Sequence, residues 1–152
     1  MLLIAHRGNI TGPNPELENS ILYVEYALSQ GYAVEIDMRV VDHKIYLGHD
    51  EPQYVVGLAW LLANKHHLWI HCKNAAALEI CQRTNLHYFW HQEDDFTITS
   101  NGYIWAYPGQ EPPSDKTITV LPEIHWSMDE YKNHTTMGVC SDFVGTMKAL
   151  GA

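Results

Sequence analysis

The sequence has few basic residues, and this scarcity limits what the protein can bind. Nine lysines and arginines stand against eighteen aspartates and glutamates, which gives a formal net charge of −9 at pH 7 with histidine counted as neutral. Such an acidic chain repels a phosphate backbone, so we expect no nucleic-acid partner. A small phosphorylated ligand held in a local pocket together with a cation remains compatible with this charge.

Cysteines and long hydrophobic runs are also scarce. The chain has only three cysteines, Cys72, Cys81 and Cys140, with no CxxC spacing. An odd number without that spacing disfavours a disulfide framework and a structural zinc site, and it fits a reducing compartment. The longest apolar run, residues 55–63, is too short to cross a bilayer, and the first residues make a poor secretion signal. We therefore expect a cytoplasmic location and no membrane partner.

What remains is an ordinary globular composition. The 152 residues are 46% hydrophobic and 18% charged, and the sequence contains neither a linker nor a repeat of fixed period. This length and balance predict one domain over residues 1–152 with a real hydrophobic core. The proline- and glycine-rich stretch at residues 107–116 is interpreted as a surface loop.

The first half of the chain alternates between predicted strands and helices. Apolar patterns predict strands at residues 2–5, 33–40, 44–47 and 68–72, and helices at residues 18–30, 57–65 and 75–83. Gly31 is placed to end the first helix. The alternation favours a parallel sheet or barrel with right-handed crossovers.

The second half has short strands and little helix. Strands are predicted at residues 86–90, 96–99, 103–107, 118–121 and 138–141. One helix is predicted at residues 127–133, where Ser127 and Glu130 fit a capping box. A last helix is predicted at residues 143–150, with Ser141 or Asp142 as its N-terminal cap and Gly151 after its end.

Two carboxylates lie on one face of the predicted strand at residues 33–40. Alternate residues of a strand share a face, so Glu35, Asp37 and Arg39 point one way while the apolar residues between them point the other. Carboxylate oxygens suit magnesium or calcium, so the pair could bind a hard cation. An exposed sheet face with ordinary surface charges explains the pattern equally well.

Histidines and basic residues follow the ends of other predicted strands. His71 and Lys73 repeat the alternating geometry, while His6 and Arg7 follow the first strand and His49 lies in a turn. Arginine binds phosphate oxygens with a fork of donors, and two histidines from separate loops can serve as general acid and general base. Taken singly, each histidine would more often be a core or surface-turn residue.

Each of three further polar residues has two alternative roles. His91 and Asp94 belong to a polar segment after the strand at residues 86–90, where a ligand or a substrate contact is possible but a solvated turn is more common. Asp142 could reach the same site or merely cap a helix. The five tryptophans are expected mainly in the core, although one at a pocket rim could stack on a glycerol or sugar face.

Taken in order, these residues resemble the glycerophosphodiester phosphodiesterase family, one of the phospholipase-C-like phosphodiesterase barrels. The matching segments cover roughly the first half of the chain, and their order and spacing agree with the family: Ile4-Ala5-His6-Arg7-Gly8, Glu18-Asn19-Ser20, Gly31, Glu35-Ile36-Asp37 and Leu47-Gly48-His49-Asp50.

The resemblance implies a (β/α)₈ barrel, of the TIM type, with its site at the carboxyl ends of the strands. It implies His6 and His49 as the catalytic acid–base pair, and Glu35 and Asp37 as ligands of one divalent metal ion. It also implies that Arg7 and Lys73 bind the phosphate. The implied reaction is hydrolysis of a small phosphodiester, in which a neighbouring hydroxyl attacks phosphorus.

The sequence departs from the family in two ways. His71 stands where the family usually has a third carboxylate ligand, which favours manganese or zinc over magnesium or calcium if His71 binds the metal. His71 could instead contact the substrate. The second departure is length, because such a barrel usually needs ~200 residues or more. We therefore expect a reduced barrel that lacks several helices in its second half, with a thin side that a second copy could cover in a homodimer.

Two other functions are compatible with the sequence. A non-catalytic module could bind a phosphate or sugar phosphate in the same pocket, having lost turnover through the change at His71. A different metal-dependent hydrolase or lyase could also use the same scaffold, because fold does not fix function.

Overall fold

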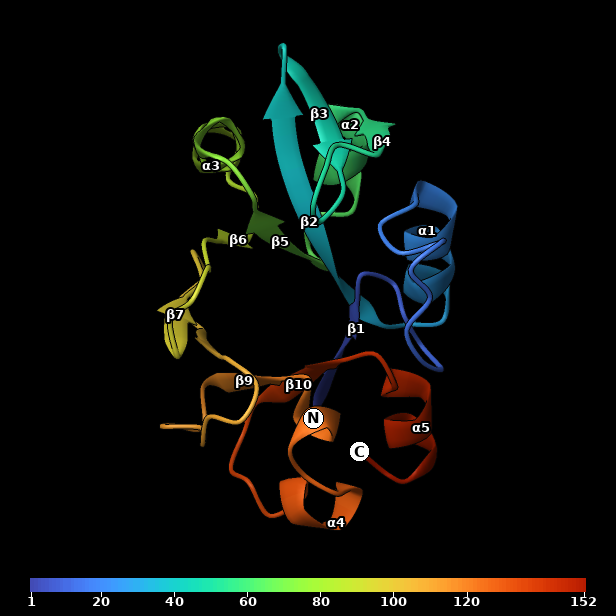
Figure 1. Ribbon diagram of the computed structural model, residues 1–152, viewed down its shortest axis with the longest axis vertical. Coiled ribbons are helices and arrows are strands. Elements are labelled where there is room, and N and C mark those ends of the chain that lie inside the picture. The colour runs from blue at the N-terminus through green and yellow to red at the C-terminus, as the bar shows by residue number, and fades with distance from the viewer.

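A computed structural model describes residues 1–152 of the chain as a curled, mostly parallel sheet with helices outside it (Figure 1). The first half contains β1 (Leu2–His6), α1 (Ile21–Ser29), β2 (Ala33–Val41), β3 (Lys44–Leu47), β4 (Tyr54–Val56), α2 (Leu58–Ala63), β5 (Leu68–Cys72) and α3 (Ala75–Thr84). The second half contains β6 (Tyr88–Phe89), β7 (Phe96–Ile98), β8 (Ile104–Ala106), β9 (Thr117–Val120), a 3₁₀ turn η1 (Pro122–Ile124), α4 (Met128–Tyr131), β10 (Gly138–Ser141) and α5 (Val144–Ala149).

The parallel strands follow one another in the order β6, β5, β2, β1, β10, β9 and β8. Strand β7 pairs antiparallel with β8, while β3 and β4 extend β2 as an antiparallel arm. The two ends of the curl approach each other where Ser100 donates from its backbone N–H to the Tyr88 carbonyl at 2.8 Å. This mixed α/β architecture is consistent with the predicted reduced TIM-like barrel.

Helices cover the curled sheet unevenly. Figure 1 shows α1, α2, α3 and α5 outside the strands, and no helix beside β7. Between β6 and β10 the only helical elements are η1 and the four-residue helix α4. The predicted shortage of helices in the second half is therefore confirmed.

The core has an outer and an inner layer because β2 alternates between them. Val34, Ile36 and Met38 point outward into a cluster of 18 buried residues that includes side chains of the helices. A second cluster of 8 buried residues fills the inside of the curl and includes Ile4 and Trp105. The inward side of β2 therefore carries its polar residues into the interior of the barrel.

Several predicted boundaries were wrong, and side-chain hydrogen bonds explain two of the errors. Helix α1 begins at Ile21 rather than at residue 18, because Asn19 adopts a φ of 65° and exchanges two hydrogen bonds with Asp37. Helix α5 has Phe143 at its N-cap with no side-chain cap. The predicted cap by Ser141 or Asp142 was wrong because the Asp142 carboxylate accepts hydrogen bonds from His6 and Asn9 instead.

Other differences concern short strands and helix lengths. The strand β4 was not predicted, and its residues 54–56 overlap the start of the apolar run. The strand predicted at residues 86–90 is reduced to the two residues of β6, and the helices predicted at 57–65 and 127–133 are shorter than expected. The capping box of Ser127 and Glu130 is confirmed.

His87 is expected to make stability depend on pH. Its side chain is buried beside Thr99, and burial lowers its pKa to about 4 from an ordinary value near 6.5. Between about pH 6.5 and 4, His87 is therefore protonated in the unfolded chain but not in the folded chain. The free energy of unfolding falls as the pH is lowered through this window. The loss is at most about 3 kcal/mol.

The variant His87→Gln keeps an amide that can bond Thr99 but cannot titrate. Urea unfolding at pH 7 and pH 4.5 should show a smaller loss of stability in this variant than in the wild type. Equal losses in the two proteins would remove His87 as the cause.

None of the helices combines the length and the apolar character needed to cross a membrane.

Candidate functional site

The carboxyl ends of three neighbouring strands bring the predicted polar residues together. In the parallel register, His6 of β1 lies opposite Glu35 of β2, and Asp37 of β2 lies opposite His71 of β5. All four side chains occupy inward-pointing positions of their strands. The local strand pattern and the strand order together therefore create one polar cluster at this end of the barrel.

Glu35, Asp37 and His71 form the centre of the cluster. A potential ligand atom from each lies within 4.8 Å of the others. The Nδ1 atom of His71 is 3.3 Å from Asp37 Oδ1 and 3.8 Å from Glu35 Oε1. Glu35 and Asp37 are buried, with 2% and 0% of their surfaces exposed. Two buried carboxylates at this spacing require neutralising charge or hydrogen bonds.

The hydrogen bond on the far side of His71 orients its ring. Its Nε2–H donates to the carbonyl of His91 at 2.8 Å, and the ring stacks on Phe89 at 4.9 Å between centroids. Because Nε2 carries the hydrogen, neutral His71 presents the Nδ1 lone pair to the two carboxylates. This is the arrangement of a metal-ligating histidine held by a backbone carbonyl.

The two carboxylates differ in their affinity for protons. Burial and the neighbouring charge of Asp37 raise the pKa of Glu35. Burial acts in the same direction on Asp37, but contacts with His71 and Arg7 outweigh it and hold the pKa of Asp37 well below its ordinary value. The cluster therefore contains a firmly ionised carboxylate beside one that resists ionisation.

The donor set fits a divalent cation. The Oδ1 atom of Asp37 is buried without a hydrogen-bond partner, and it faces Nδ1 of His71. An unpartnered buried carboxylate oxygen is costly unless a cation satisfies it. Two carboxylates and one imidazole form a mixed oxygen and nitrogen set, which suits manganese or zinc as well as magnesium.

His6 is held by Asp142, which follows the neighbouring strand β10. Its Nδ1–H donates to Asp142 Oδ1 at 2.7 Å, which leaves Nε2 toward Glu35 at 3.9 Å. Burial lowers the pKa of His6, but the hydrogen bond with Asp142 and the charge of Glu35 outweigh it and raise the pKa overall. Asp142 is in turn fixed by its backbone N–H, which donates to Glu123 at 2.9 Å.

Arg7 lies between several acids at the mouth of the cluster. Its Nε is 3.1 Å from Asp37 Oδ2, and its Nη1 donates to Glu18 Oε2 at 3.3 Å. Asn9 connects Arg7 to the pair formed by His6 and Asp142. Its side-chain amide donates one hydrogen bond to Glu18 and one to Asp142. The guanidinium is therefore fixed in place.

His49 belongs to a turn that requires glycine before it. Gly48 has a φ of 152°, and a Cβ there would meet the Glu51 carbonyl oxygen at 2.0 Å. His49 is partly exposed and its Nδ1 contacts Asp50 at 2.7 Å. Burial lowers the pKa of His49, so its neutral form dominates at neutral pH. Hence the two histidines have opposite pKa shifts.

Arg39 holds the turn that carries His49. Its Nε donates to the Gly48 carbonyl at 3.1 Å, and its Nη2 donates to the His49 carbonyl. If the protein is an enzyme that uses His49, Arg39→Lys should lower kcat about tenfold or more with little change in metal affinity, because lysine cannot make both bonds. Steady-state kinetics with a metal titration will test this prediction. An unchanged kcat would show that the turn keeps its conformation without the two hydrogen bonds from Arg39.

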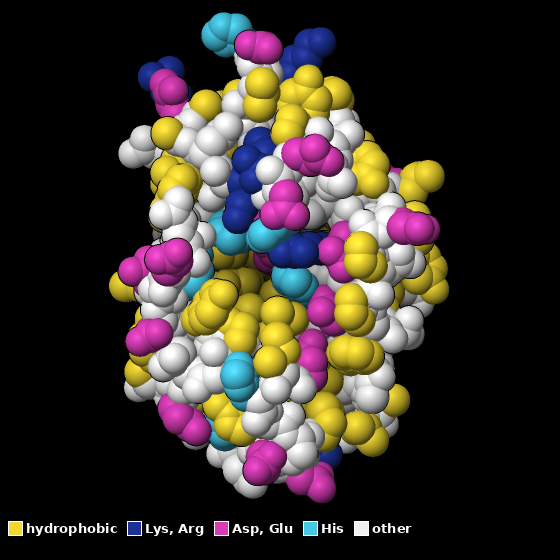
Figure 2. Space-filling view, viewed as in Figure 1, with side chains coloured by type: hydrophobic (Ala, Val, Ile, Leu, Met, Phe, Trp, Pro, Cys, Tyr) yellow, Lys and Arg dark blue, Asp and Glu magenta, His cyan; other side chains and the backbone are white.

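Three hollows meet at this cluster, and His49 lines all of them. The first, about 150 Å³, also contains His6, Glu35 and His71. The second, about 350 Å³, also contains His6 and Asp142. The third, about 600 Å³, contains Lys73, His91 and Tyr107. Figure 2 shows a hollow in the middle of this face with histidines and basic side chains around it.

The structure thus brings together all seven predicted site residues, His6, Arg7, Glu35, Asp37, His49, His71 and Lys73. Two of the residues whose roles the sequence did not decide also belong to the site. Asp142 accepts a hydrogen bond from His6, and the buried His91 accepts one from His71 at its backbone carbonyl. Asp94 contributes only a carbonyl, which accepts from His91. Sequence reasoning missed Asn9 and Glu123, whose partners lie far along the chain, and it did not assign Arg39 to the His49 turn.

The comparisons with known proteins support the fold. The structure is similar to that of a glycerophosphodiester phosphodiesterase from Agrobacterium tumefaciens str. C58, with a TM-score of 0.64 and 15% sequence identity. The match covers 98% of this chain and 99% of that chain. No family model matches the sequence. No curated protein matches it either.

Proposed function

We propose that the protein hydrolyses a small phosphodiester of the glycerophosphodiester type with the help of one divalent metal ion. The observation that carries this proposal is the convergence of His6, Glu35, Asp37 and His71 at one end of the barrel, with His49 lining the same hollow. The similarity in fold to a phosphodiesterase supports it.

Glu35, Asp37 and His71 would hold the metal ion. When bound, a divalent cation stabilises negative charge on the phosphoryl oxygens. Lys73 lines the hollow beside His71 and His91 and takes part in no ion pair, so its ammonium group is available to a phosphate. Arg7, held by Glu18 and Asp37, would present its guanidinium to the same group.

The two histidines would move the protons. A hydroxyl next to the phosphodiester attacks phosphorus and gives its proton to one imidazole. The bond from phosphorus to the leaving alcohol breaks, and the other imidazole protonates that alcohol. Water then opens the cyclic phosphate with the two roles reversed. Asp142 fixes the ring of His6 through Nδ1, so Nε2 is the atom available for proton transfer.

A direct assay tests the proposal. Purified protein would be incubated with glycerophosphocholine and with bis(4-nitrophenyl) phosphate in the presence of magnesium, calcium, manganese or zinc. We expect turnover of glycerophosphocholine with at least one metal. We expect much slower turnover of bis(4-nitrophenyl) phosphate, which lacks the neighbouring hydroxyl. The absence of turnover with every metal would contradict the enzyme proposal.

The replacement of the family's carboxylate by His71 supplies a separate prediction. The variant His71→Glu adds a negative charge to the cluster, so it should increase the affinity for magnesium or calcium by about tenfold or more relative to manganese. Calorimetric titration of each metal measures this ratio. An unchanged ratio would mean that residue 71 does not bind the metal.

A non-catalytic phosphate-binding module is the second candidate. It is favoured by the contacts of His71 with both carboxylates, because an imidazolium there could take the place of a metal ion. This alternative predicts calorimetric binding of glycerol 3-phosphate without added metal, and no product from any diester.

A further inference from the structure

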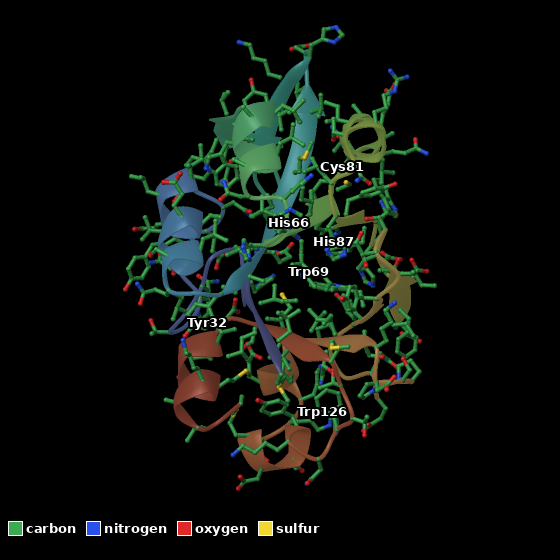
Figure 3. The ribbon with its side chains drawn as sticks, turned by 180° about the vertical axis from the view of Figure 1, so that it is seen from behind. Tyr32, His66, Trp69, Cys81, His87 and Trp126 are labelled. Atoms are coloured by element: carbon green, nitrogen blue, oxygen red, sulfur yellow. The ribbon has the colours of Figure 1, made fainter.

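A large cavity opens at the end of the barrel opposite the candidate site. It has a volume of about 540 Å³ and lies at the amino ends of β1, β2 and β5, where Leu3, Ala33 and Trp69 line it. Figure 3, drawn from behind, shows Trp69, His66 and His87 near the middle of the barrel on this side. The polar site just described lies at the other ends of the same strands.

The two sites are separated by packed side chains. Trp69 precedes His71 on the inward side of β5, so it belongs to the layer below the metal cluster. Trp69 packs with Phe89, Trp105 and Ile118 in the inner core cluster. The cavity is therefore a bowl closed at its base by the core, and not a second entrance to the candidate active site.

The chemistry of this bowl differs from that of the rest of the chain. The molecule has twice as many acidic as basic side chains, yet no aspartate or glutamate lines the bowl. Lys148 and the exposed His66 and His67 stand at its edge. A local surplus of hydrogen-bond donors in an acidic protein favours an anionic ligand.

Two polar ring atoms of the bowl have no hydrogen-bond partner in the chain. Trp69 and His87 are 5% and 8% exposed, and both line the bowl. The indole N–H of Trp69 takes part in no hydrogen bond of the chain. His87 forms a hydrogen bond with Thr99 through Nε2, and its Nδ1 has no partner in the chain. The indole N–H of Trp69 and the ammonium group of Lys148 donate only, so a ligand that pairs with them must supply an acceptor such as a phosphate or carboxylate oxygen.

Aromatic rings form the walls around these donors. Trp69 lies 4.2 Å from His87 and 5.1 Å from Tyr103 between ring centroids. On the other side, the Lys148 ammonium stands 5.2 Å above the ring of Tyr32. Flat walls of this kind accept the face of a planar ring or a sugar, while the ammonium group can reach an attached anion.

We propose that this bowl is a second binding site, for a small organic anion that joins a planar ring to a phosphate or carboxylate group. The ring would stack on Trp69 and Tyr103, and the anionic group would take hydrogen bonds from Lys148 and its neighbours. The site is independent of the phosphodiesterase proposal, because none of its residues belongs to the metal cluster.

The test uses NMR and calorimetry with ring-bearing anions, adenosine monophosphate and phenyl phosphate, and with adenosine and inorganic phosphate as partial probes. The Trp69 indole signal is assigned by its disappearance in Trp69→Phe, which keeps the ring packing. We expect at least one ring-bearing anion to shift this signal saturably and to bind about tenfold more tightly than either partial probe.

Matched variants locate the binding. Lys148→Ala should weaken binding of the anion about tenfold, whereas Lys132→Ala directly after α4 and His49→Ala at the other end of the barrel should leave its affinity unchanged. The proposal is overturned if no ring-bearing anion shifts the Trp69 signal at millimolar concentrations. It is also overturned if binding survives Lys148→Ala but is lost in His49→Ala, because the ligand would then occupy the opposite site.

Discussion

Replacing either His6 or His49 with alanine is expected to lower kcat for glycerophosphocholine by about 10²–10⁴-fold. Each substitution removes one of the two groups proposed to move protons. The other two imidazoles of the hollow, His71 and His91, are each held by a hydrogen bond to a backbone carbonyl and do not replace it. Because both histidines serve one reaction, the double variant should be little slower than the slower single variant. Steady-state kinetics with saturating metal will measure all three.

The control for this prediction is a histidine of the same chain that lies away from the site. His43 is exposed in the turn between β2 and β3 and has a positive φ, which asparagine tolerates, so His43→Asn should keep full activity. Metal affinity should persist in His49→Ala, which shows that the cluster is still formed. A rate within threefold of wild type in either active-site variant would contradict the assigned roles.

Removing the charge of Asp37 is expected to abolish metal binding and activity together. Asp37 is fully buried, its Oδ1 faces His71, and its other oxygen contacts Arg7 and Asn19. Asp37→Asn preserves the shape but removes the anion that a cation needs. For the wild type, manganese at about 100 times its dissociation constant should add ~2.7 kcal/mol of stability. The variant should gain almost nothing.

Thermal unfolding with and without manganese measures this difference. Asp129→Asn on the exposed first turn of α4 is the matched control, and it should respond to manganese like the wild type. A metal-induced rise in Tm that is the same in Asp37→Asn as in the wild type would place the ion elsewhere. An active metal-free protein would mean that the cluster works through its own charges, with His71 as the cation.

The sequence could predict those parts of the site that depend on local alternation. Glu35 and Asp37 share a face because strand geometry has a period of two, and His71 follows the same rule on its own strand. These positions needed no knowledge of the fold. Their approach to one another required only that the strands be parallel neighbours, which the alternation of strands and helices indicated.

The remaining contacts depend on positions far apart in the chain. Asp142 reaches His6 across 136 residues, so its role as a partner of the histidine could not be distinguished from a helix cap by sequence alone. The late start of α1 has a similar cause, because Asn19 forms hydrogen bonds with Asp37, 18 residues away, and these oppose the local preference for helix. Tertiary hydrogen bonds decided both cases.

The most direct test of this account is a crystal structure of the protein soaked with manganese, with the ion located by its anomalous scattering. We predict one ion bonded to Glu35, Asp37 and the Nδ1 atom of His71, at distances of about 2.0–2.3 Å, with His6 and His49 on either side of an adjacent open position. An empty cluster at saturating manganese, or an ion held only by exposed acids, would contradict it.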